Sequence, residues 1–146
     1  MSNIEERQFK KKICVVDITN LPDNIQHTME SSGDATYVQA GHLTTTINGN
    51  IITVEGHRFI ADVIVSGLYF KLKHGIKVAV KVGEISSEYV KAGIITPYLS
   101  VSFLVQVDER ELGEIRVGDM ITCKIIDWSL TLKNNKVFPS IYAEKV

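Results

Sequence analysis

The last part of the chain, residues 116–146, constrains the fold most strongly. Apolar and polar side chains alternate through 121–125, and a period of two is typical of a β-strand with one buried face. A Val117–Asp119 turn precedes this strand. After it, Asn134-Asn135 tolerates positive φ, so the chain can reverse into a final strand. The end of the chain therefore predicts a β-hairpin.

The first half of the chain predicts several strands and one short helix. Residues 1–10 are polar, and we expect them to fray. Pro22 suits the first turn of a helix that ends at Gly33. The apolar stripe of that helix consists of Leu21, Ile25 and Met29. The strands expected around it are 11–18, 35–39, 42–47, 50–55 and 58–72.

Three glycine-containing segments punctuate these strands. Asn48-Gly49 lies between two β-rich runs and predicts a hairpin turn. Gly67 predicts a bulge or bend within 58–72. Lys73–Gly75 is a basic break, and we take it as the junction between two domains, 1–72 and 73–146.

The second half predicts more strands and little helix. The expected β-segments are 76–82, 86–93, 94–99 and 101–107, and 108–118 is a polar connector with one helical turn. The fold class is therefore mainly β with a small α component, α+β in its broader sense.

Composition narrows the class of protein. The net charge is −1 and the pI about 6.4, which is weak for a protein that binds nucleic acid unaided. The two cysteines, Cys14 and Cys123, form no CxxC pair, and we expect buried free thiols in a reducing compartment. The polar N-terminus is no signal peptide, and no apolar run approaches the about 20 residues of a membrane span. We expect an intracellular protein without a membrane partner.

Catalytic motifs are missing from the sequence. It contains no GxxxxGK or GxGxxG loop, no GxSxG elbow and no HExxH pair. The carboxylates of 108–119 alternate with arginines and predict a solvated connector. His42 and His57 flank Asn48-Gly49, and their ordinary interpretation is turn or surface histidines. We expect no enzyme activity, no cofactor and no metal.

A mixture of basic and aromatic residues predicts a nucleic-acid surface. Barrels that bind single strands combine a positive face with rings on which bases stack. In 76–82, Lys77 and Lys81 alternate with valines and so share one face. The candidate RNA-binding residues are Lys77, Lys81, Tyr89, Lys91 and Tyr98. The alternative is a polar outer face with tyrosines in the core.

The order of elements resembles a known family. A strand and a Pro-containing helix (KICVVDITNLPDNIQHTM) are followed by GHLTTTINGNIITVEG and by FIADVIVSGLYFKLKHG, which ends at the basic junction. The chain closes with VGDMITCKIIDWSLTLKNNKVFPSIYAEKV. Over residues 10–146 this layout resembles the stalk subunit (seventh-subunit) family of multisubunit DNA-dependent RNA polymerases. The short chain points to a viral or divergent member.

The resemblance implies a fold and a role. Residues 1–72 would form a small tip domain that docks on the polymerase, and 73–146 an S1-type oligonucleotide-binding barrel. The subunit would be non-catalytic, and its partners would be the large polymerase subunits, nascent RNA held weakly and transcription factors. Cellular members commonly also have a second small stalk subunit, and the sequence leaves open whether this chain has one. It would work in the nucleus or cytoplasm, or in the virion or host cytoplasm if viral.

The resemblance leads to a candidate docking surface and leaves one alternative function. Exposed apolar side chains near Asn48-Gly49, namely Ile47, Ile51 and Ile52, are the candidate docking residues. The alternative function is a free-standing protein with the same barrel that binds single-stranded nucleic acid by itself.

Overall fold

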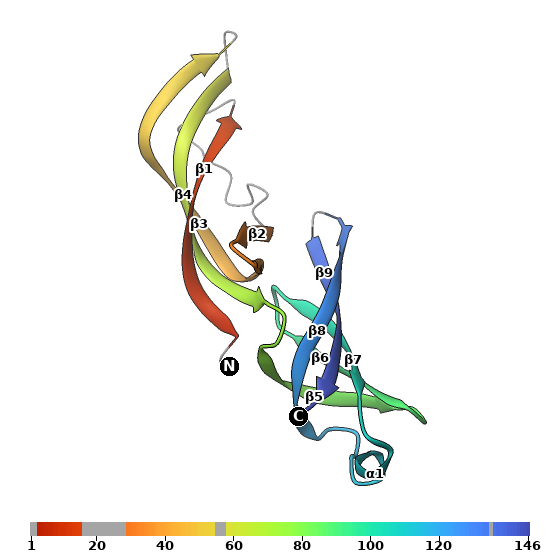
Figure 1. The fold of residues 1–146 in the computed structure, drawn as a ribbon. Helices are drawn as coiled ribbons and strands as arrows, with labels where there is room; N and C mark the ends of the chain where they lie inside the picture. The colour runs from red at the N-terminus through yellow and green to blue at the C-terminus, as the bar shows by residue number, and fades with distance from the viewer. Residues whose placement is uncertain (1–2, 16–28, 55–57, 135) are drawn as a thin grey trace.

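The computed structural model describes residues 3–15, 29–54, 58–134 and 136–146. The described chain is almost entirely β, which confirms the mainly β class (Figure 1). Its elements are β1 Ile4–Val15, β2 Met29–Ser32, β3 Ala35–Val54, β4 Arg58–Leu72, β5 Lys77–Ile85, β6 Tyr89–Ile95, β7 Ser100–Gln106, α1 Glu109–Leu112, β8 Met120–Lys133 and β9 Lys136–Lys145.

The last five strands close into a barrel. Their order is β5-β6-β7-β9-β8, and β8 pairs with β5 to complete the circle. The pairs are antiparallel except for β7 and β9, which run parallel, and α1 connects β7 to β8. In β5, exposed Lys77, Ala79 and Lys81 alternate with valines that are buried inside the barrel. The sequence period therefore sets the inner and outer faces of the strand.

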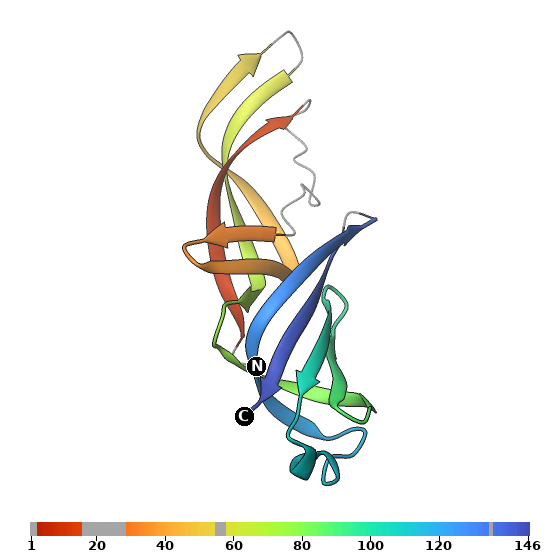
Figure 2. The same ribbon diagram turned by 45° about the vertical axis from the view of Figure 1, so that its right-hand side comes forward.

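The first four strands form a separate sheet in the order β1-β4-β3-β2. The sheet stands above the barrel, and β4 leads down from it into β5 (Figure 2). One face of this sheet carries an aromatic cluster of Phe9, Tyr37 and Tyr69, with ring centroids 5.0–6.5 Å apart. The Arg7 guanidinium lies 4.5 Å from the centroid of the Tyr37 ring and donates a hydrogen bond to its hydroxyl at 2.7 Å.

Strand β4 contributes to two hydrophobic cores, one on each face. Val63, Val65 and Tyr69 belong to the core of the sheet, whereas Phe70 and Leu72 belong to the core of the barrel. The base of the sheet thus covers part of the barrel interior. The barrel shares its core with residues from the base of the sheet. The division into domains 1–72 and 73–146 stays a prediction.

The N-terminal residues depart from the sequence expectation. Residues 4–10 do not fray; they belong to β1, which pairs with β4 from Ile4↔Phe70 onward. The pairing gives polar residues 5–8 a backbone ladder, and Phe9 packs into the aromatic cluster. The expected helix around Pro22 lies outside the described residues, except that Met29 of its stripe begins β2.

The Asn48-Gly49 hairpin prediction is wrong. Strand β3 continues through these residues, and its pairing with β4 shifts register between Ile47 and Ile51. Gly49 has a φ of 106°, so the NG pair supplies the positive φ of a β-bulge instead of a turn. Both predicted strands, 42–47 and 50–55, therefore belong to β3 and pair with β4 instead of with each other.

Gly67 lies where two backbones approach closely. It pairs with Leu43, next to a second register shift in β3 between Gln39 and Leu43. A β-carbon at Gly67 would stand 2.6 Å from the His42 carbonyl oxygen and 2.7 Å from Leu43 Cδ2. The irregularity that Gly67 predicted is therefore present, but the extra residues belong to the facing strand.

Several local predictions in the second half are confirmed. Asn134 has a φ of 52° in the turn between β8 and β9, and α1 supplies the single helical turn of the polar connector. The cysteine prediction is half right: Cys123 is buried in the barrel, but Cys14 is exposed. Cys14 pairs with Ile60 on the face of the sheet that the aromatic cluster does not occupy.

Candidate nucleic-acid interface

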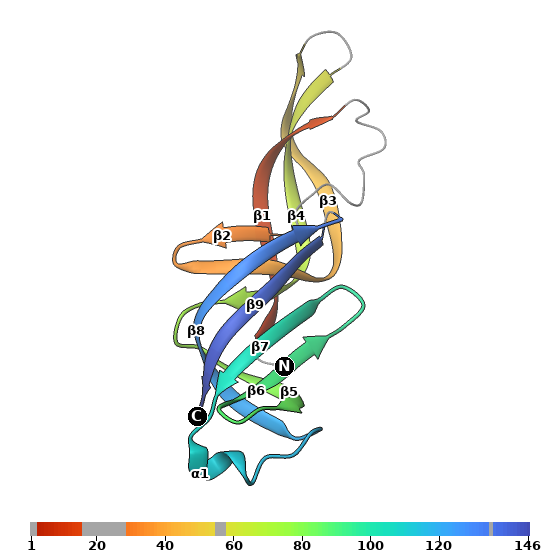
Figure 3. The same ribbon diagram turned by 90° about the vertical axis from the view of Figure 1, so that its right-hand side faces the viewer.

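A shallow hollow of about 350 Å³ lies on the barrel across β6, β7 and β9. These three strands lie side by side with their ladders in register (Figure 3). The exposed side chains that line the hollow are Lys91, Ser102, Ser140 and Tyr142, and half-buried Leu104 lies among them. Two consecutive strands, β6 and β7, and one strand from the end of the chain, β9, thus build one surface.

A row of small residues forms the floor of this surface. Gly93 of β6 pairs with Ser102 of β7, which pairs with Ser140 of β9, which in turn pairs with Ser129 of β8. On the other side, Gly93 pairs with Lys81 of β5. Small side chains leave room above the sheet, and the row has an exposed lysine at one end.

The adjacent row is larger and more apolar. Lys91 pairs with Leu104, and Leu104 pairs with Tyr142 across the parallel strands. Tyr142 is 55% exposed although it belongs to a regular strand. An exposed ring beside an aliphatic side chain and a lysine provides a stacking surface next to a cation.

Carboxylates partly neutralise two lysines of the barrel, of which Lys91 lines the hollow. Lys91 Nζ lies 3.8 Å from Glu84 Oε2, and Lys124 Nζ lies 3.0 Å from Glu144 Oε1. In contrast, Lys81 forms no ion pair with any described residue. Exposed pairs of this kind exchange readily with solvent, so a phosphate can replace the carboxylate.

The residues predicted from the sequence are spread over more than this hollow. Lys91 lines it, and Lys81 stands at the end of its small-residue row. Tyr89 is half-buried beside Gln106, and Lys77 pairs with Lys124 where β5 meets β8, outside the hollow. Tyr98 is 49% exposed in the turn between β6 and β7, beyond the paired residues.

Tyr142, Ser102 and Ser140 line the hollow but are not among the residues predicted from the sequence. The signal was present, since Ser140 and Tyr142 alternate with buried Ile141 and Ala143, and Ser102 alternates with Val101 and Phe103. What the alternation cannot supply is the parallel pairing of β7 with β9, which brings these residues together.

The candidate docking residues lie on β3 beside its bulge. Ile47 and Ile51 are each 40% exposed and pair with Val63 and Ala61. Ile52 pairs with Ile60, and its side chain is outside the described part of the chain. Two apolar side chains are thus accessible on the upper part of the sheet.

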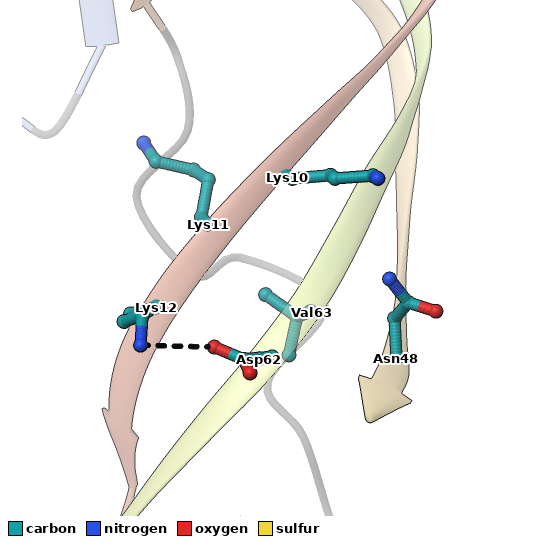
Figure 4. A pocket seen from close by; sticks show the side chains of 6 residues that line it. All are labelled: Lys10, Lys11, Lys12, Asn48, Asp62 and Val63. Atoms are coloured by element: carbon teal, nitrogen blue, oxygen red, sulfur yellow. Dashed lines mark ion pairs between the residues drawn. The ribbon is translucent and has the colours of Figure 1, made fainter. Parts of the chain in front are cut away.

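A second hollow, of about 260 Å³, lies on the N-terminal sheet (Figure 4). Lys10 and Lys12 of β1, Asp62 of β4 and Asn48 from the β3 bulge line it. Lys12 Nζ lies 3.6 Å from Asp62 Oδ1, which offsets part of its charge. The described residues that line this hollow include no aromatic ring and so provide no stacking surface.

The groups with shifted pKa values are buried away from both hollows. Burial, with a smaller contribution from Glu30, raises the pKa of Tyr69 to about 12, and burial raises the pKa of Cys123 to about 11. In the described ranges, His, Cys, Asp and Glu side chains form no group of three that would hold a metal ion, and His57 lies outside those ranges.

The described part of the chain contains no helix with the length and apolar character needed to cross a membrane. What the barrel surface offers chemically is a ring, serine hydroxyls and lysines along a shallow track. No protein-family model matches the chain, and a search of curated proteins found no match either.

Proposed function

We propose that the chain binds single-stranded nucleic acid, without catalysis, along the small-residue row of β6, β7 and β9. The observation that carries this proposal is the strand order of the barrel, with parallel β7 and β9 and a helical turn between β7 and β8. That topology supports an oligonucleotide-binding barrel of the S1 type. Such barrels bind through the face of their second and third strands, which correspond here to β6 and β7.

The surface chemistry favours a single strand over a duplex. Tyr142 and Leu104 offer an apolar platform for one or two bases, which a duplex keeps stacked inside. Lys81 and Lys91 stand on the β5 and β6 side of the track, where they reach phosphates. Because the net charge is −1 and Lys91 is paired with Glu84, the affinity of the free chain is expected to be weak.

We further propose that this chain is a stalk subunit of a DNA-dependent RNA polymerase, in which weak contact with nascent RNA is sufficient. The order of elements in the sequence is one support. A second is a sheet beside the barrel that exposes Ile47 and Ile51, side chains suited to docking on a large subunit. Docking would raise the local concentration of RNA and compensate for low intrinsic affinity.

Two measurements test these proposals separately. Fluorescence anisotropy of the isolated chain with labelled oligo(U), at low salt, should show saturable binding that an unlabelled duplex does not displace. If the chain alone shows no saturable binding at low salt, the proposal that its barrel binds single-stranded nucleic acid is wrong.

Affinity capture of the tagged full chain from its native cell tests the stalk proposal. We expect the large polymerase subunits to be retained, and Ile47→Asp with Ile51→Asp to release them. Tight RNA binding by the free chain, without any polymerase subunit in the capture, would instead support the free-standing protein.

A further inference from the structure

Among the described strands, none pairs with the upper part of the outer edge of β3. Strand β2 covers this edge only from Ala35 to Val38, and from Leu43 onward no described strand pairs with it. In Figure 1 the upper part of β3 forms the outer margin of the sheet, with β4 on its inner side. Its backbone groups on that side therefore offer hydrogen bonds to another strand.

The two edges of the upper sheet differ in charge. The β1 edge carries Lys10, Lys11 and Lys12, and charged residues, lysine above all, discourage the addition of a foreign strand. The β3 edge carries no charged residue from Leu43 to Val54 and is rich in threonine and isoleucine, which favour strands. One edge is thus protected and the other is not.

Two bulges limit the regular part of the exposed edge. The register with β4 shifts between Gln39 and Leu43 and again between Ile47 and Ile51. The straight segment between them is Leu43–Ile47, and its central residue is Thr45. Bulges interrupt pairing, so an added strand would be held over this segment.

This segment is chemically symmetric about Thr45. Read in either direction it is an aliphatic residue, three threonines and an aliphatic residue. If a second copy pairs antiparallel with Thr45 opposite Thr45, Leu43 meets Ile47 on one face and Thr44 meets Thr46 on the other. Apolar pairs and Thr–Thr pairs are favourable cross-strand neighbours, and a two-fold dimer requires such self-complementarity.

We propose that this edge binds a second copy of the chain, forming a symmetric dimer with a sheet that runs continuously through both β3 strands. Thr44 and Thr46 are exposed, and Ile47 is 40% exposed, so the side chains beside the edge are accessible. The paired segment is short, and the dimer is expected to be weak and concentration-dependent. Because Ile47 also belongs to the candidate docking surface, the dimer and the docked state exclude each other.

Sedimentation velocity of the full chain tests this proposal directly. The parent protein should move toward twice the monomer mass as its concentration rises. The double variant Thr44→Lys with Thr46→Lys places like charges opposite each other twice across the symmetry axis. It should weaken the dimer about tenfold or more. Gln8→Lys, on the exposed face of the β1 edge, is the matched control and should leave the dimer unchanged.

A charge exchange distinguishes loss of pairing from loss of fold. A second double variant, Thr44→Glu with Thr46→Glu, should also be monomeric alone, but the lysine and glutamate variants mixed together should form a heterodimer. A parent protein that remains monomeric at about 1 mM leaves the edge to some other protein and overturns the proposal. The proposal is also overturned if the mixed lysine and glutamate variants do not associate, or if the lysine variant dimerises as strongly as the parent protein.

Discussion

Leu104 and Tyr142 are paired where β7 and β9 run parallel, and Lys91 of β6 pairs with Leu104 from its other side. The pairing places an exposed aromatic ring beside an aliphatic side chain and a cation on a surface of otherwise small residues. We regard this group as the centre of the proposed binding surface.

Replacing Tyr142 tests that centre. Tyr142→Ala should weaken binding of oligo(U) about 5- to 150-fold, the loss expected for one stacked base, whereas Tyr142→Phe should retain most of the affinity. Fluorescence anisotropy at fixed low salt measures both. Tyr98→Ala is the informative comparison: if it costs more affinity than Tyr142→Ala, the strand binds at the β6–β7 turn instead.

The lysines should act through phosphates. Lys81→Gln together with Lys91→Gln should lower the salt dependence of binding, by about 0.7 in the log–log slope for each phosphate that the variant no longer neutralises. Titrations at four or more salt concentrations give the slope. Lys133→Gln, at the distant end of the β8–β9 hairpin, is the control. An unchanged slope in the double variant would show that neither lysine binds the strand.

Two glycines offer a matched test of packing. Gly67→Ala should destabilise the fold by about 1–3 kcal/mol, because its β-carbon would press on the His42 carbonyl. Gly113→Ala adds the same atom in open space at a φ of −68°, so it should be neutral or slightly stabilising. Urea unfolding followed by circular dichroism measures the free energy of unfolding of both variants. Equal stability of the two would contradict the close approach of β3 and β4.

Two tyrosine hydroxyls in the sheet should have opposite effects on stability. The Tyr37 hydroxyl accepts a hydrogen bond from Arg7, so Tyr37→Phe should cost about 1 kcal/mol. The Tyr69 hydroxyl is buried without a hydrogen-bond partner among the described residues, so Tyr69→Phe should leave stability unchanged or raise it. Thermal or urea unfolding measures the stability of both variants. A larger loss of stability in Tyr69→Phe than in Tyr37→Phe would contradict this account.

Stability should fall at alkaline pH in a way that depends on Cys123. Its thiol pKa rises from 9.0 to about 11 because the buried thiolate would lose its hydration. Between these values the unfolded chain releases the proton while the folded chain retains it. The free energy of unfolding should therefore decrease by up to about 1.4 kcal/mol per pH unit. Urea unfolding measured from pH 9 to about pH 11 gives this decrease. Cys123→Ala should make the decrease in the free energy of unfolding less steep, whereas Cys14→Ala, at an exposed site, should not change it.

The sequence by itself determined several strands of the barrel and their faces. The alternation of 76–82 and 121–125 assigned the buried and exposed sides of β5 and β8, since a side chain in a strand can take only one of two faces. It also located the reversal at Asn134, because few residues adopt a positive φ without strain.

Pairing partners were decided by the tertiary structure. Asn48-Gly49 satisfies the local requirements of both a turn and a bulge, and the continuous ladder with β4 selected the bulge. Residues 5–8 are too polar to predict a strand, yet β4 supplies their backbone with partners. The hollow beside Tyr142 exists because β9 returns parallel to β7. Such a contact joins residues far apart in the chain, and no local pattern encodes which strand will lie beside which.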